Sequence, residues 1–402
     1  MEDIVIVGGG QAGGCAAAAL RQSGYTGRLV LIGDEKHPPY ERPPLSKELL
    51  SGVVPPEKTY LQPTSWYTDA KVDLLLGVRV EKIDRTAKTL CLSTGATIPY
   101  GALLMTMGAR ARQLARVPPS SSVFYLRTIE EALALNLACD RGKRIAVIGA
   151  GFIGLEVAAT ARKQGCHVVV FETAKHVLAR VAPRVVADYV QQLHEQNGIQ
   201  FEFGCAITNV QAGAPSAVLL GDGRRFEVDL IVVGIGAQPN VEIAIEAGLT
   251  VDDGVVVDEF GRTNDPAIFA AGDVTKHFNP LLGRAIRLEA WQNAQNQAIA
   301  VAKVMAGGND PFAEVPWLWT DQFDMNMQIA GAPLDNDSIV VRGDVNARSF
   351  TVFQMSGTKL VGAIAVNAAK DMRFVRRMLA KISDFDATAL ADSNVSLQDL
   401  SR

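Results

Sequence analysis

The feature that most constrains this chain is a motif that occurs twice. Residues 3–24 read DIVIVGGGQAGGCAAAALRQSG, and residues 144–165 read RIAVIGAGFIGLEVAATARKQG, 141 positions later. Each copy joins a short apolar run, a GxGxxG turn and an Ala-rich segment, and each leads into a second apolar run, at 29–32 and 168–171. The pattern predicts two strand–turn–helix units of the same kind.

Each glycine of such a unit has its own function. The first makes the tight turn, the second lets the backbone approach a pyrophosphate, and the third lets helix and strand pack closely. These are Gly8, Gly10 and Gly13 in the first copy and Gly149, Gly151 and Gly154 in the second. An acid that binds ribose hydroxyls is expected about 20 residues further on. Asp34 and Glu35 follow the first copy at this spacing, and Glu172 follows the second.

Two complete units in one chain predict two bound nucleotides rather than glycines used for packing alone. One nucleotide would be a resident flavin dinucleotide and the other a visiting nicotinamide dinucleotide. This pairing has a chemical reason, because a nicotinamide delivers two electrons as a hydride, whereas a flavin can release them singly.

The remaining pattern predicts an α/β protein with two Rossmann-like dinucleotide-binding domains and a C-terminal α+β domain. Segments 98–112 and 229–239 are each predicted to contain a strand that ends at a glycine, and we interpret them as crossings between the nucleotide domains. The predicted domains are an FAD-binding domain split over 1–112 and 240–312, an NAD(H)-binding domain at 113–239, and the C-terminal domain at 313–402. In the last, strands are predicted at 338–342, 349–354 and 359–366 and a helix at 370–381.

Composition excludes several other classes. Of the 402 residues, 48% are hydrophobic and 20% charged, and the net charge of −4 gives no general attraction to nucleic acid. The five cysteines are scattered without a CxxC spacing, which favours a reducing compartment and gives no metal site. No basic segment precedes the first apolar run, and no apolar stretch approaches the roughly 18 residues that span a bilayer. We therefore expect a cytoplasmic protein without a membrane or nucleic-acid partner.

Three further stretches narrow the class. Residues 39–47 read PYERPPLSK, residues 287–294 read RLEAWQNA, and residues 316–331 read PWLWTDQFDMNMQIAG. From residue 3 to about residue 380 the chain resembles the NADH-dependent ferredoxin reductases of bacterial oxygenase systems, flavoproteins of the glutathione-reductase type. The resemblance implies that a hydride passes from NADH to FAD. Single electrons then pass to a [2Fe–2S] ferredoxin that feeds a Rieske dioxygenase or a haem monooxygenase.

One departure from the wider class matters. Glutathione-reductase-like enzymes carry a redox disulfide just after the first nucleotide unit, whereas here PYERPPLSK stands in that place without a cysteine. Electrons must therefore leave the flavin directly. Two alternatives stay open: a related reductase that uses rubredoxin, oxygen or a small organic acceptor, and a non-enzymatic flavoprotein whose response to NADH alters the binding of a partner.

The resemblance also implies roles for individual residues. Lys47 would lie near flavin N5, Glu156 would face it where the nicotinamide lies, and Trp319 would stand at the flavin's edge towards a docked ferredoxin. The implied FAD-binding residues are Gly8, Gly10, Ala12, Gly13, Asp34, Glu35, Arg42, Lys47, Val80, Gly108, Arg127, Gly272, Asp273, Glu289, Ala290 and Trp291. The implied NAD-binding residues are Gly149, Gly151, Phe152, Ile153, Gly154, Glu156, Glu172, Gly234, Ile235 and Gly236.

Two of these assignments have a physical consequence. The helix predicted from Glu289 to about Met305 would direct its positive dipole end at the pyrimidine edge of the flavin. Glu172 would accept hydrogen bonds from ribose hydroxyls and repel a 2′-phosphate, which predicts a preference for NADH over NADPH. Lys175 and Arg180 lie close to Glu172 in the sequence and act against this preference.

The helix predicted at 370–381 carries five basic residues and one acid. Such a run is commonly a solvated helix face, and the alternative is a docking surface for an acidic ferredoxin. The candidate docking residues are Arg284, Arg287, Lys370, Arg373, Arg376 and Arg377. The expected oligomeric state is a monomer or a weak dimer.

Overall fold

The computed structural model describes residues 3–333, 338–381 and 383–402. The chain divides into two compact units. Unit 1 comprises Met1–Arg42, Glu57–Arg110 and Gln238–Pro316, and unit 2 comprises Pro43–Pro56, Ala111–Ala237 and Trp317–Arg402. Strands β8 (Ala109–Ala111) and β17 (Ala237–Pro239) pair as a two-stranded sheet where the chain passes from one unit to the other.

Unit 1 is built on a five-stranded parallel sheet in the order β19-β7-β1-β2-β3. Its strands are β1 (Ile4–Val7), β2 (Leu29–Gly33), β3 (Val72–Leu76), β7 (Ala102–Met105) and β19 (Ile268–Ala270). Every residue of β1 and β2 is buried, because both faces of the sheet are covered. A parallel sheet of this kind brings the carboxyl ends of its strands together at one edge, where ligands of such folds bind.

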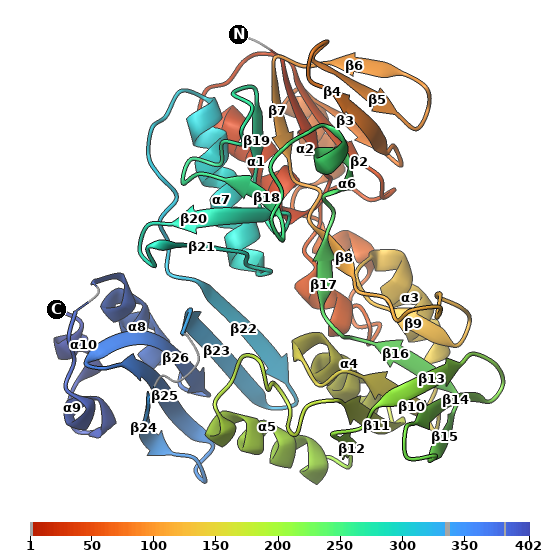
Figure 1. Ribbon diagram of the computed structural model, residues 1–402, viewed down its shortest axis with the longest axis vertical. Helices are drawn as coiled ribbons and strands as arrows, with labels where there is room; N and C mark the ends of the chain where they lie inside the picture. Colours follow the sequence, from red (N-terminus) through yellow and green to blue (C-terminus); the bar gives the residue numbers. More distant parts are fainter. Residues whose placement is uncertain (1–2, 334–337, 382) are drawn as a thin grey trace. The chain divides into compact units, whose positions relative to one another are not determined.

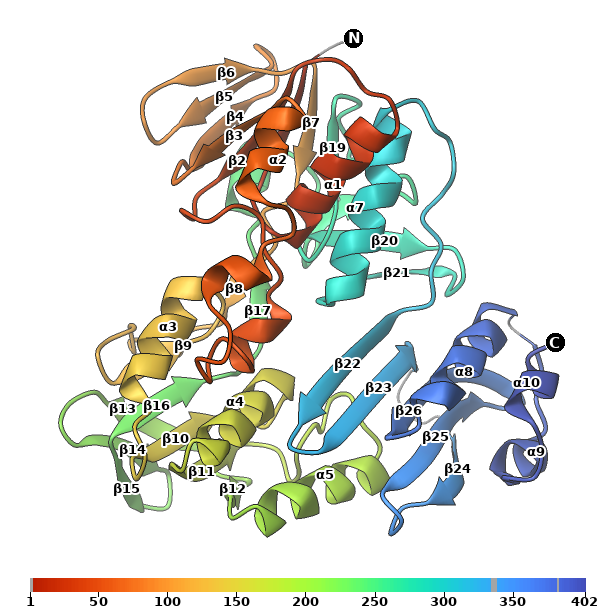
Figure 2. The ribbon, with the colours of Figure 1, turned by 180° about the vertical axis from the view of Figure 1, so that it is seen from behind.

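The two faces of this sheet pack against different elements. Ile4 and Ile6 share one core with helices α1 (Gln11–Gln22) and α7 (Trp291–Met305), which lie side by side, and with Tyr67 of α2 (Thr64–Asp69) (Figures 1 and 2). Val5 and Val7 share the opposite core with strands of smaller sheets. These sheets contain β4 (Val80–Asp84), β5 (Thr89–Leu92), β6 (Thr97–Pro99), β18 (Val255–Val257), β20 (Thr275–Asn279) and β21 (Arg284–Ile286), and α6 (Glu242–Glu246) packs beside them.

Unit 2 repeats the arrangement with a parallel sheet in the order β12-β11-β10-β16-β9. Its strands are β9 (Val123–Tyr125), β10 (Arg144–Ile148), β11 (His167–Glu172), β12 (Gln200–Phe203) and β16 (Leu230–Val233). One face packs on an antiparallel sheet of β13 (Ile207–Gln211), β14 (Ser216–Leu220) and β15 (Arg225–Val228). The helices of this part are α3 (Ile129–Ala138), α4 (Phe152–Lys163) and α5 (Arg184–Gln196).

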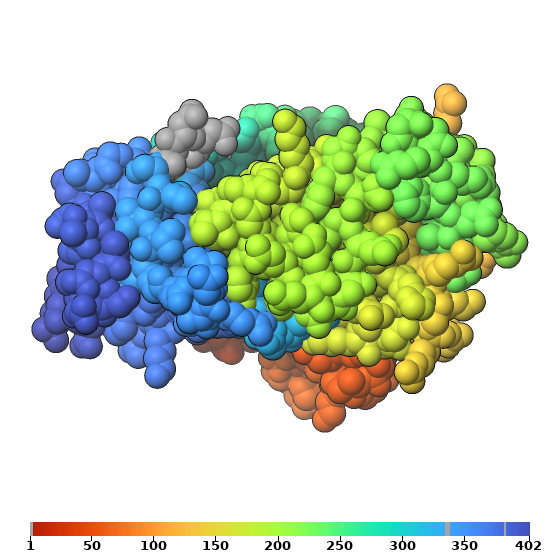
Figure 3. Space-filling model, turned by 90° about the horizontal axis from the view of Figure 1, so that it is seen from below, coloured from red at the N-terminus to blue at the C-terminus, as the bar shows by residue number. Residues whose placement is uncertain are grey.

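The last part of unit 2 is a five-stranded antiparallel sheet in the order β22-β23-β26-β25-β24. Its strands are β22 (Trp317–Gln322), β23 (Met325–Gly331), β24 (Ser338–Asp344), β25 (Ser349–Ser356) and β26 (Lys359–Val366), and its helices are α8 (Ala369–Lys381), α9 (Ala387–Ala391) and α10 (Leu397–Leu400). Helix α8 is strongly amphipathic, with Met372, Val375 and Met378 buried against the sheet. Figure 3 shows α5 beside this part of the chain on one face of unit 2.

The predicted elements agree closely with this structure, with small differences at their ends. Helix α7 begins at Trp291, two residues after the predicted start, because its N-cap Ala290 has extended backbone angles. Segment 98–112 forms three short strands rather than one, since Gly101 and Gly108 interrupt it. The predicted strands of the C-terminal part and its basic helix are present, with some ends one or two residues longer than predicted.

Candidate functional site

Both glycine-rich turns have the close packing that the sequence predicts. A Cβ atom on Gly13 would stand 2.0 Å from the carbonyl oxygen of Gly8, and a Cβ on Gly154 would stand 2.0 Å from that of Gly149. Gly8 and Gly149 themselves have φ of +118° and +104°, a region that favours glycine. The first and third glycines of each turn are therefore required by the fold of the backbone itself.

The second glycine of each turn meets a different environment. A Cβ on Gly151 would meet no atom within 4 Å, and a Cβ on Gly10 would meet one, Nη2 of Arg42 at 3.6 Å. Gly10 and Gly151 also have negative φ, of −94° and −82°. Neither packing nor backbone angles explain these glycines. The space beside each leaves room for a ligand to approach the backbone closely.

The helices that follow present unsatisfied donors to the same spaces. Gly10 caps α1 and Gly151 caps α4, and neither helix has a side-chain cap or an acidic residue in its first turn. The N–H groups of a helix's first turn have no partner inside the helix, and the helix dipole favours an anion there. The uncapped helix starts are thus a second reason, besides the glycine motif, why both turns fit the pyrophosphate of a dinucleotide.

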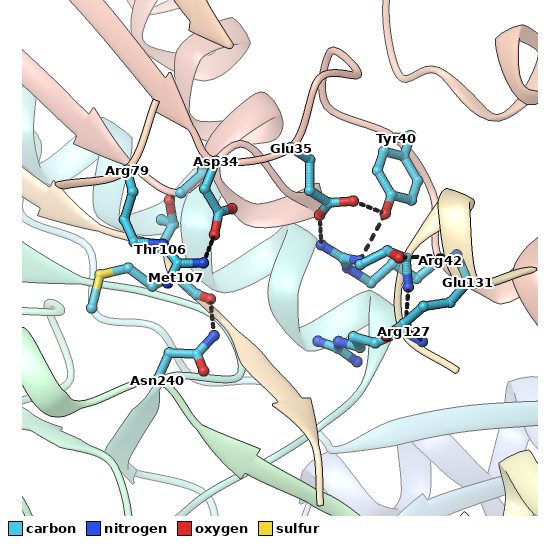
Figure 4. Close-up of polar contacts among 12 residues, drawn as sticks. Asp34, Glu35, Tyr40, Arg42, Arg79, Thr106, Met107, Arg127, Glu131 and Asn240 are labelled. Atoms are coloured by element: carbon cyan, nitrogen blue, oxygen red, sulfur yellow. Dashed lines mark hydrogen bonds and ion pairs between the residues drawn. The ribbon is translucent and has the colours of Figure 1, made fainter. Parts of the chain in front are cut away.

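In unit 1 the acid at the end of β2 belongs to a closed polar cluster (Figure 4). Glu35 accepts hydrogen bonds from Tyr40 at 2.5 Å and from Nη2 of Arg42 at 2.8 Å, while Nη1 of Arg42 donates to the Tyr40 hydroxyl at 2.9 Å. Burial alone would lower the pKa of Arg42, but Tyr40, Glu35 and Asp273 outweigh it and raise the pKa. Asp34 instead faces solvent, paired with Arg79 at 3.0 Å. Glu35 is thus the better placed of the two ribose-binding candidates.

In unit 2 the corresponding acid is Glu172, the last residue of β11. Its two carboxylate oxygens accept backbone N–H bonds from Ala150 and Ala174, each at 2.8 Å. The Thr173 hydroxyl also donates to Oε1 at 3.2 Å. The carboxylate is therefore held beside the glycine turn, and Oε2, which accepts from Ala150, retains a further lone pair for a hydroxyl donor.

Lys47 and Glu156, which lie 109 positions apart in the sequence, form an ion pair at 2.7 Å. The Glu156 side chain is 4% exposed and that of Lys47 15%. Ser46 donates to the same carboxylate at 2.5 Å, and Thr320 of β22 donates to its other oxygen at 2.6 Å. These three donors hold the buried carboxylate in one orientation.

The two tryptophans of β22 are stacked. Their ring centroids lie 5.3 Å apart at an interplanar angle of 22°, and the guanidinium of Arg376 in α8 lies 5.3 Å from the centroid of Trp317. Trp317 also donates to Gln328 at 3.3 Å. Helix α8 and Trp319 are thus connected through Trp317.

The other predicted residues occupy varied positions. Thr106, just after β7, donates to the Gly8 carbonyl at 3.0 Å, and Gly108, two residues later, has φ of +61° and accepts a hydrogen bond from the backbone of Asn240. Gly272 has φ of +84° and donates to the buried Gln297 at 2.8 Å, next to Asp273. In unit 2, Gly234 packs on the second turn, where a Cβ would stand 3.2 Å from the nitrogen of Gly154.

Two of the remaining predicted residues, Arg127 and Glu289, interact with residues close to them in the sequence. The backbone of Arg127 donates to Glu131 in the capping box of α3, and Glu289 pairs with Arg287. Ala12, Val80 and Ala290 lie in α1, at the start of β4 and at the N-cap of α7, and Phe152 and Ile153 open α4. Ile235 and Gly236 follow β16, and Gly236 has φ of +107°.

Several residues at the site were not predicted from the sequence. Ser46, Thr320, Gln322 and His194 surround or extend the Lys47–Glu156 pair, and Tyr40 completes the Glu35 cluster. Ser46 and Tyr40 lie inside PYERPPLSK, so this stretch was the available signal. No sequence signal connects His194 with Glu156.

Cysteine and metal chemistry have no support in the described residues. The five cysteines are free, and no group of three or more His, Cys, Asp or Glu side chains in the described residues could hold a metal ion. Burial raises the pKa of Cys15 to about 11, so its thiol is not activated. No helix in the described part of the chain is long and apolar enough to cross a membrane.

Comparison with known proteins agrees with this geometry. The family model described as pyridine nucleotide-disulphide oxidoreductase matches residues 2–298, and the model described as reductase C-terminal matches residues 317–401. The ferredoxin–NAD(+) reductase component of the anthranilate 1,2-dioxygenase system of Burkholderia cepacia is 42% identical over 400 residues, which cover 99% of this chain and 98% of the relative.

Two solved structures share the whole fold. The ferredoxin reductase for the CYP199A2 system from Rhodopseudomonas palustris is 40% identical, with a TM-score of 0.95 and full coverage of both chains. The covalent putidaredoxin reductase–putidaredoxin complex is 34% identical, with a TM-score of 0.96 over 99% of this chain and 98% of that one.

These comparisons confirm the predicted fold class, the resemblance to ferredoxin reductases of oxygenase systems, and FAD and NADH as the cofactors. The chain belongs to the pyridine nucleotide-disulphide oxidoreductase family and, within it, is similar to the ferredoxin–NAD(+) reductase components of oxygenase systems.

Proposed function

We propose that this chain is an FAD-dependent NADH:ferredoxin oxidoreductase that supplies a [2Fe–2S] ferredoxin of an oxygenase system. The observation that carries the proposal is the presence of two glycine turns, each with an uncapped helix N-terminus and a fixed acid beside it. Two such sites accommodate two dinucleotides, as a reductase of this kind requires. The relatives named ferredoxin reductases favour a ferredoxin as the acceptor.

Unit 1 is assigned to FAD. The N–H groups at the start of α1 bind the pyrophosphate, and Glu35 accepts from the adenosine ribose, held by Tyr40 and Arg42. We keep residues 1–112 and 240–312 as the proposed FAD domain, although Pro43–Pro56 and the end of the first range belong to unit 2.

Unit 2 is assigned to NADH through residues 113–239. The start of α4 binds the pyrophosphate and Glu172 accepts from the ribose hydroxyls. Because Glu172 is fixed by two backbone N–H bonds, it cannot turn away from a 2′-phosphate at low cost. The site therefore prefers NADH to NADPH.

Bound FAD supplies the redox chemistry, since it accepts a hydride from NADH and releases electrons singly. The protein's residues orient the reactants and control charge. Lys47 and Glu156 neutralise one another at 2.7 Å, so they provide a fixed dipole without net charge. Hydride transfer needs no side chain as acid or base, and we assign this pair to orientation of the reacting groups.

Electrons leave without a disulfide, since the described cysteines are all free and those with a shifted pKa have it raised. We assign the exit to Trp319, with Trp317 and Arg376 leading from it to the face of α8. Lys370, Arg373 and Arg377 are exposed on α8 and form the basic docking face for an acidic ferredoxin. Arg287 contributes less, because Asp253 and Glu289 pair with it.

The function is tested with purified protein. A yellow protein whose NADH-dependent cytochrome c reduction rises strongly when a [2Fe–2S] ferredoxin is added supports it. Reduction of small acceptors at a rate that no ferredoxin increases would favour the alternative reductase. A long-lived charge-transfer band under excess NADH, with slow flavin reduction, would favour the non-enzymatic alternative.

The docking face is tested by reversing charge at Arg373 and Arg377 together, which leaves the Arg376–Trp317 contact in place. Electrostatic steering changes association rates by about 10- to 1000-fold, so we expect kcat/KM for ferredoxin to fall at least tenfold at low salt. The matched control reverses Lys82 and Lys88, two exposed lysines of the β4–β5 hairpin. Equal loss in both double variants, or loss of ferricyanide reduction, would contradict the assignment.

A further inference from the structure

Three buried polar side chains extend from Glu156 into the protein. Thr320 donates to Oε1 of Glu156 at 2.6 Å, Nε2 of Gln322 donates to the Thr320 hydroxyl at 3.0 Å, and Oε1 of Gln322 lies 2.8 Å from Nε2 of His194. Thr320 and His194 are fully buried, and Gln322 is 1% exposed. The chain of hydrogen bonds thus joins α4, β22 and α5 within unit 2.

The chemistry of the groups fixes the direction of every bond in this chain. Glu156 is ion-paired with Lys47 and can only accept, so the Thr320 hydroxyl donates to it and accepts from the Gln322 amide. The Gln322 carbonyl then faces His194, which must donate from Nε2. Burial lowers the pKa of His194 to about 4, so the ring is neutral at neutral pH and carries its single proton on Nε2. Its buried Nδ1 has no hydrogen-bond partner among the described residues.

The turn after β22 packs against His194, the member of this hydrogen-bonded series that lies farthest from Glu156. Phe323 has φ of +55°, an uncommon conformation for a bulky residue, and its ring lies edge-on to His194 with centroids 5.1 Å apart. Lys163 donates to the Phe323 carbonyl at 3.1 Å, and Phe201 lies 6.1 Å from the imidazole. The imidazole is thus enclosed by aromatic rings and one backbone turn.

The two oxygens of Glu156 have separate partners. Ser46 and Lys47 both bind Oε2, whereas Thr320 is the hydrogen-bond donor to Oε1 in the described residues. Rotation of the carboxylate would break the bond from Thr320 as well as those from Ser46 and Lys47, so Thr320 fixes the second oxygen. The Thr320 hydroxyl is held from the other side by the Gln322 amide, and His194 in turn binds the carbonyl of that amide.

We propose that Thr320, Gln322 and His194 are positioning residues that set the orientation of the Glu156 carboxylate during hydride transfer from NADH. The proposal rests on the role assigned to Glu156 above. It makes the C-terminal part of the chain a contributor to the nicotinamide site, in addition to the ferredoxin face. Strand β22 contributes to both the nicotinamide site and the ferredoxin face. Trp317 and Trp319 lie on one side of the strand, and Thr320 and Gln322 lie on the other.

The experiment compares two holoenzyme variants at Thr320 with a control variant at the neighbouring Asp321. Thr320→Val keeps the shape and removes the donor, Thr320→Ser restores the hydroxyl, and Asp321→Asn is a control on the exposed side of the same strand. A misplacement of about 1 Å in a group that positions reactants can cost about 100-fold, so we expect the limiting rate of flavin reduction by NADH to fall at least tenfold in Thr320→Val. The dissociation constant of NAD+ should stay unchanged, and Thr320→Ser should recover most of the rate.

A second readout does not depend on activity. Nitrogen NMR of protein with labelled histidines should show His194 as a single Nε2–H tautomer that persists to acidic pH. In Thr320→Val the Gln322 amide is free to turn over, and the Nδ1–H tautomer should appear. If Thr320→Val is unstable, His194→Phe fills the same aromatic surroundings and should slow flavin reduction in the same way.

The outcomes separate this proposal from the role of Glu156. If Glu156→Gln slows flavin reduction but Thr320→Val and His194→Phe do not, the positioning chain is wrong and the role of Glu156 stands. If Glu156→Gln itself leaves flavin reduction unchanged, the role assigned to Glu156 is wrong, and the proposal falls with it. An Nδ1–H tautomer of His194 in the unmodified protein would overturn the chain of bonds directly.

Discussion

Alanine at two glycines of one turn should have opposite consequences. In Gly151→Ala the new Cβ meets nothing within 4 Å, and the backbone angles of −82° and −176° suit any residue. The change removes chain flexibility in the unfolded state and places a slightly poorer residue at an N-cap. These effects oppose one another, so the free energy of unfolding should change by less than about 1 kcal/mol.

Gly154→Ala is the matched variant. Its Cβ would stand 2.0 Å from the Gly149 oxygen and 3.4 Å from Val147. A carbon and an oxygen normally approach to about 3.3 Å, so α4 must move away from the turn by more than about 1 Å. Overpacking of this kind costs roughly 1–3 kcal/mol or more, and this variant should lose stability whether or not a nucleotide is bound.

For the binding of NADH, in contrast to stability, we expect a large effect of Gly151→Ala. The Cβ of Gly151→Ala occupies the space that we assign to the pyrophosphate and weakens charge-assisted bonds to the start of α4. Such bonds contribute about 1.5–3 kcal/mol, so KM for NADH should rise about ten- to a hundredfold. The assay combines thermal unfolding with NADH-dependent ferricyanide reduction. An unchanged KM in Gly151→Ala, or a loss of stability equal to that of Gly154→Ala, would refute the reasoning.

Three further predictions concern other parts of the chain. Glu172→Ala should lower the ratio of kcat/KM for NADH to that for NADPH at least about tenfold, because it removes both ribose binding and phosphate repulsion; an unchanged ratio would contradict the role of Glu172. Burial lowers the pKa of His277 from 6.5 to about 4, so the unfolded chain binds the proton first. Stability should therefore be complete above pH 6.5 and fall towards pH 4, and His277→Leu should flatten this dependence in thermal unfolding. Arg342 donates to the carbonyls of Leu390, Asp392 and Val395 at 3.3, 2.6 and 2.8 Å, so Arg342→Met should cost about 2–4 kcal/mol in urea unfolding, whereas Arg402→Met should not.

The sequence predicted the fold well because its strongest signals are local. The GxGxxG turns, the apolar runs before them and the amphipathic helix at 370–381 depend on neighbours within a few residues. Element ends were less predictable, as at Ala290, where a helix-forming residue takes extended angles and becomes the N-cap.

The site was predictable to the extent that it repeats known motifs. The resemblance singled out Lys47 and Glu156, which form an ion pair. The spacing left Asp34 and Glu35 as equal candidates, whereas in the structure Glu35 lies in a half-buried cluster with Tyr40 and Arg42 and Asp34 is exposed. The positioning chain could not be predicted, because Thr320, Gln322 and His194 carry no motif. They come together through the pairing of two parts of the fold that are distant in sequence.

The central claim is that electrons pass from NADH to a [2Fe–2S] ferredoxin through FAD held by this chain. The most direct measurement mixes the holoprotein anaerobically with NADH and follows the ferredoxin's absorbance in a stopped-flow instrument. The account predicts that the flavin is reduced first and that reduced ferredoxin then accumulates at two molecules for each NADH. A flavin that is reduced by NADH but transfers no electrons to any [2Fe–2S] ferredoxin of a broad panel would contradict it.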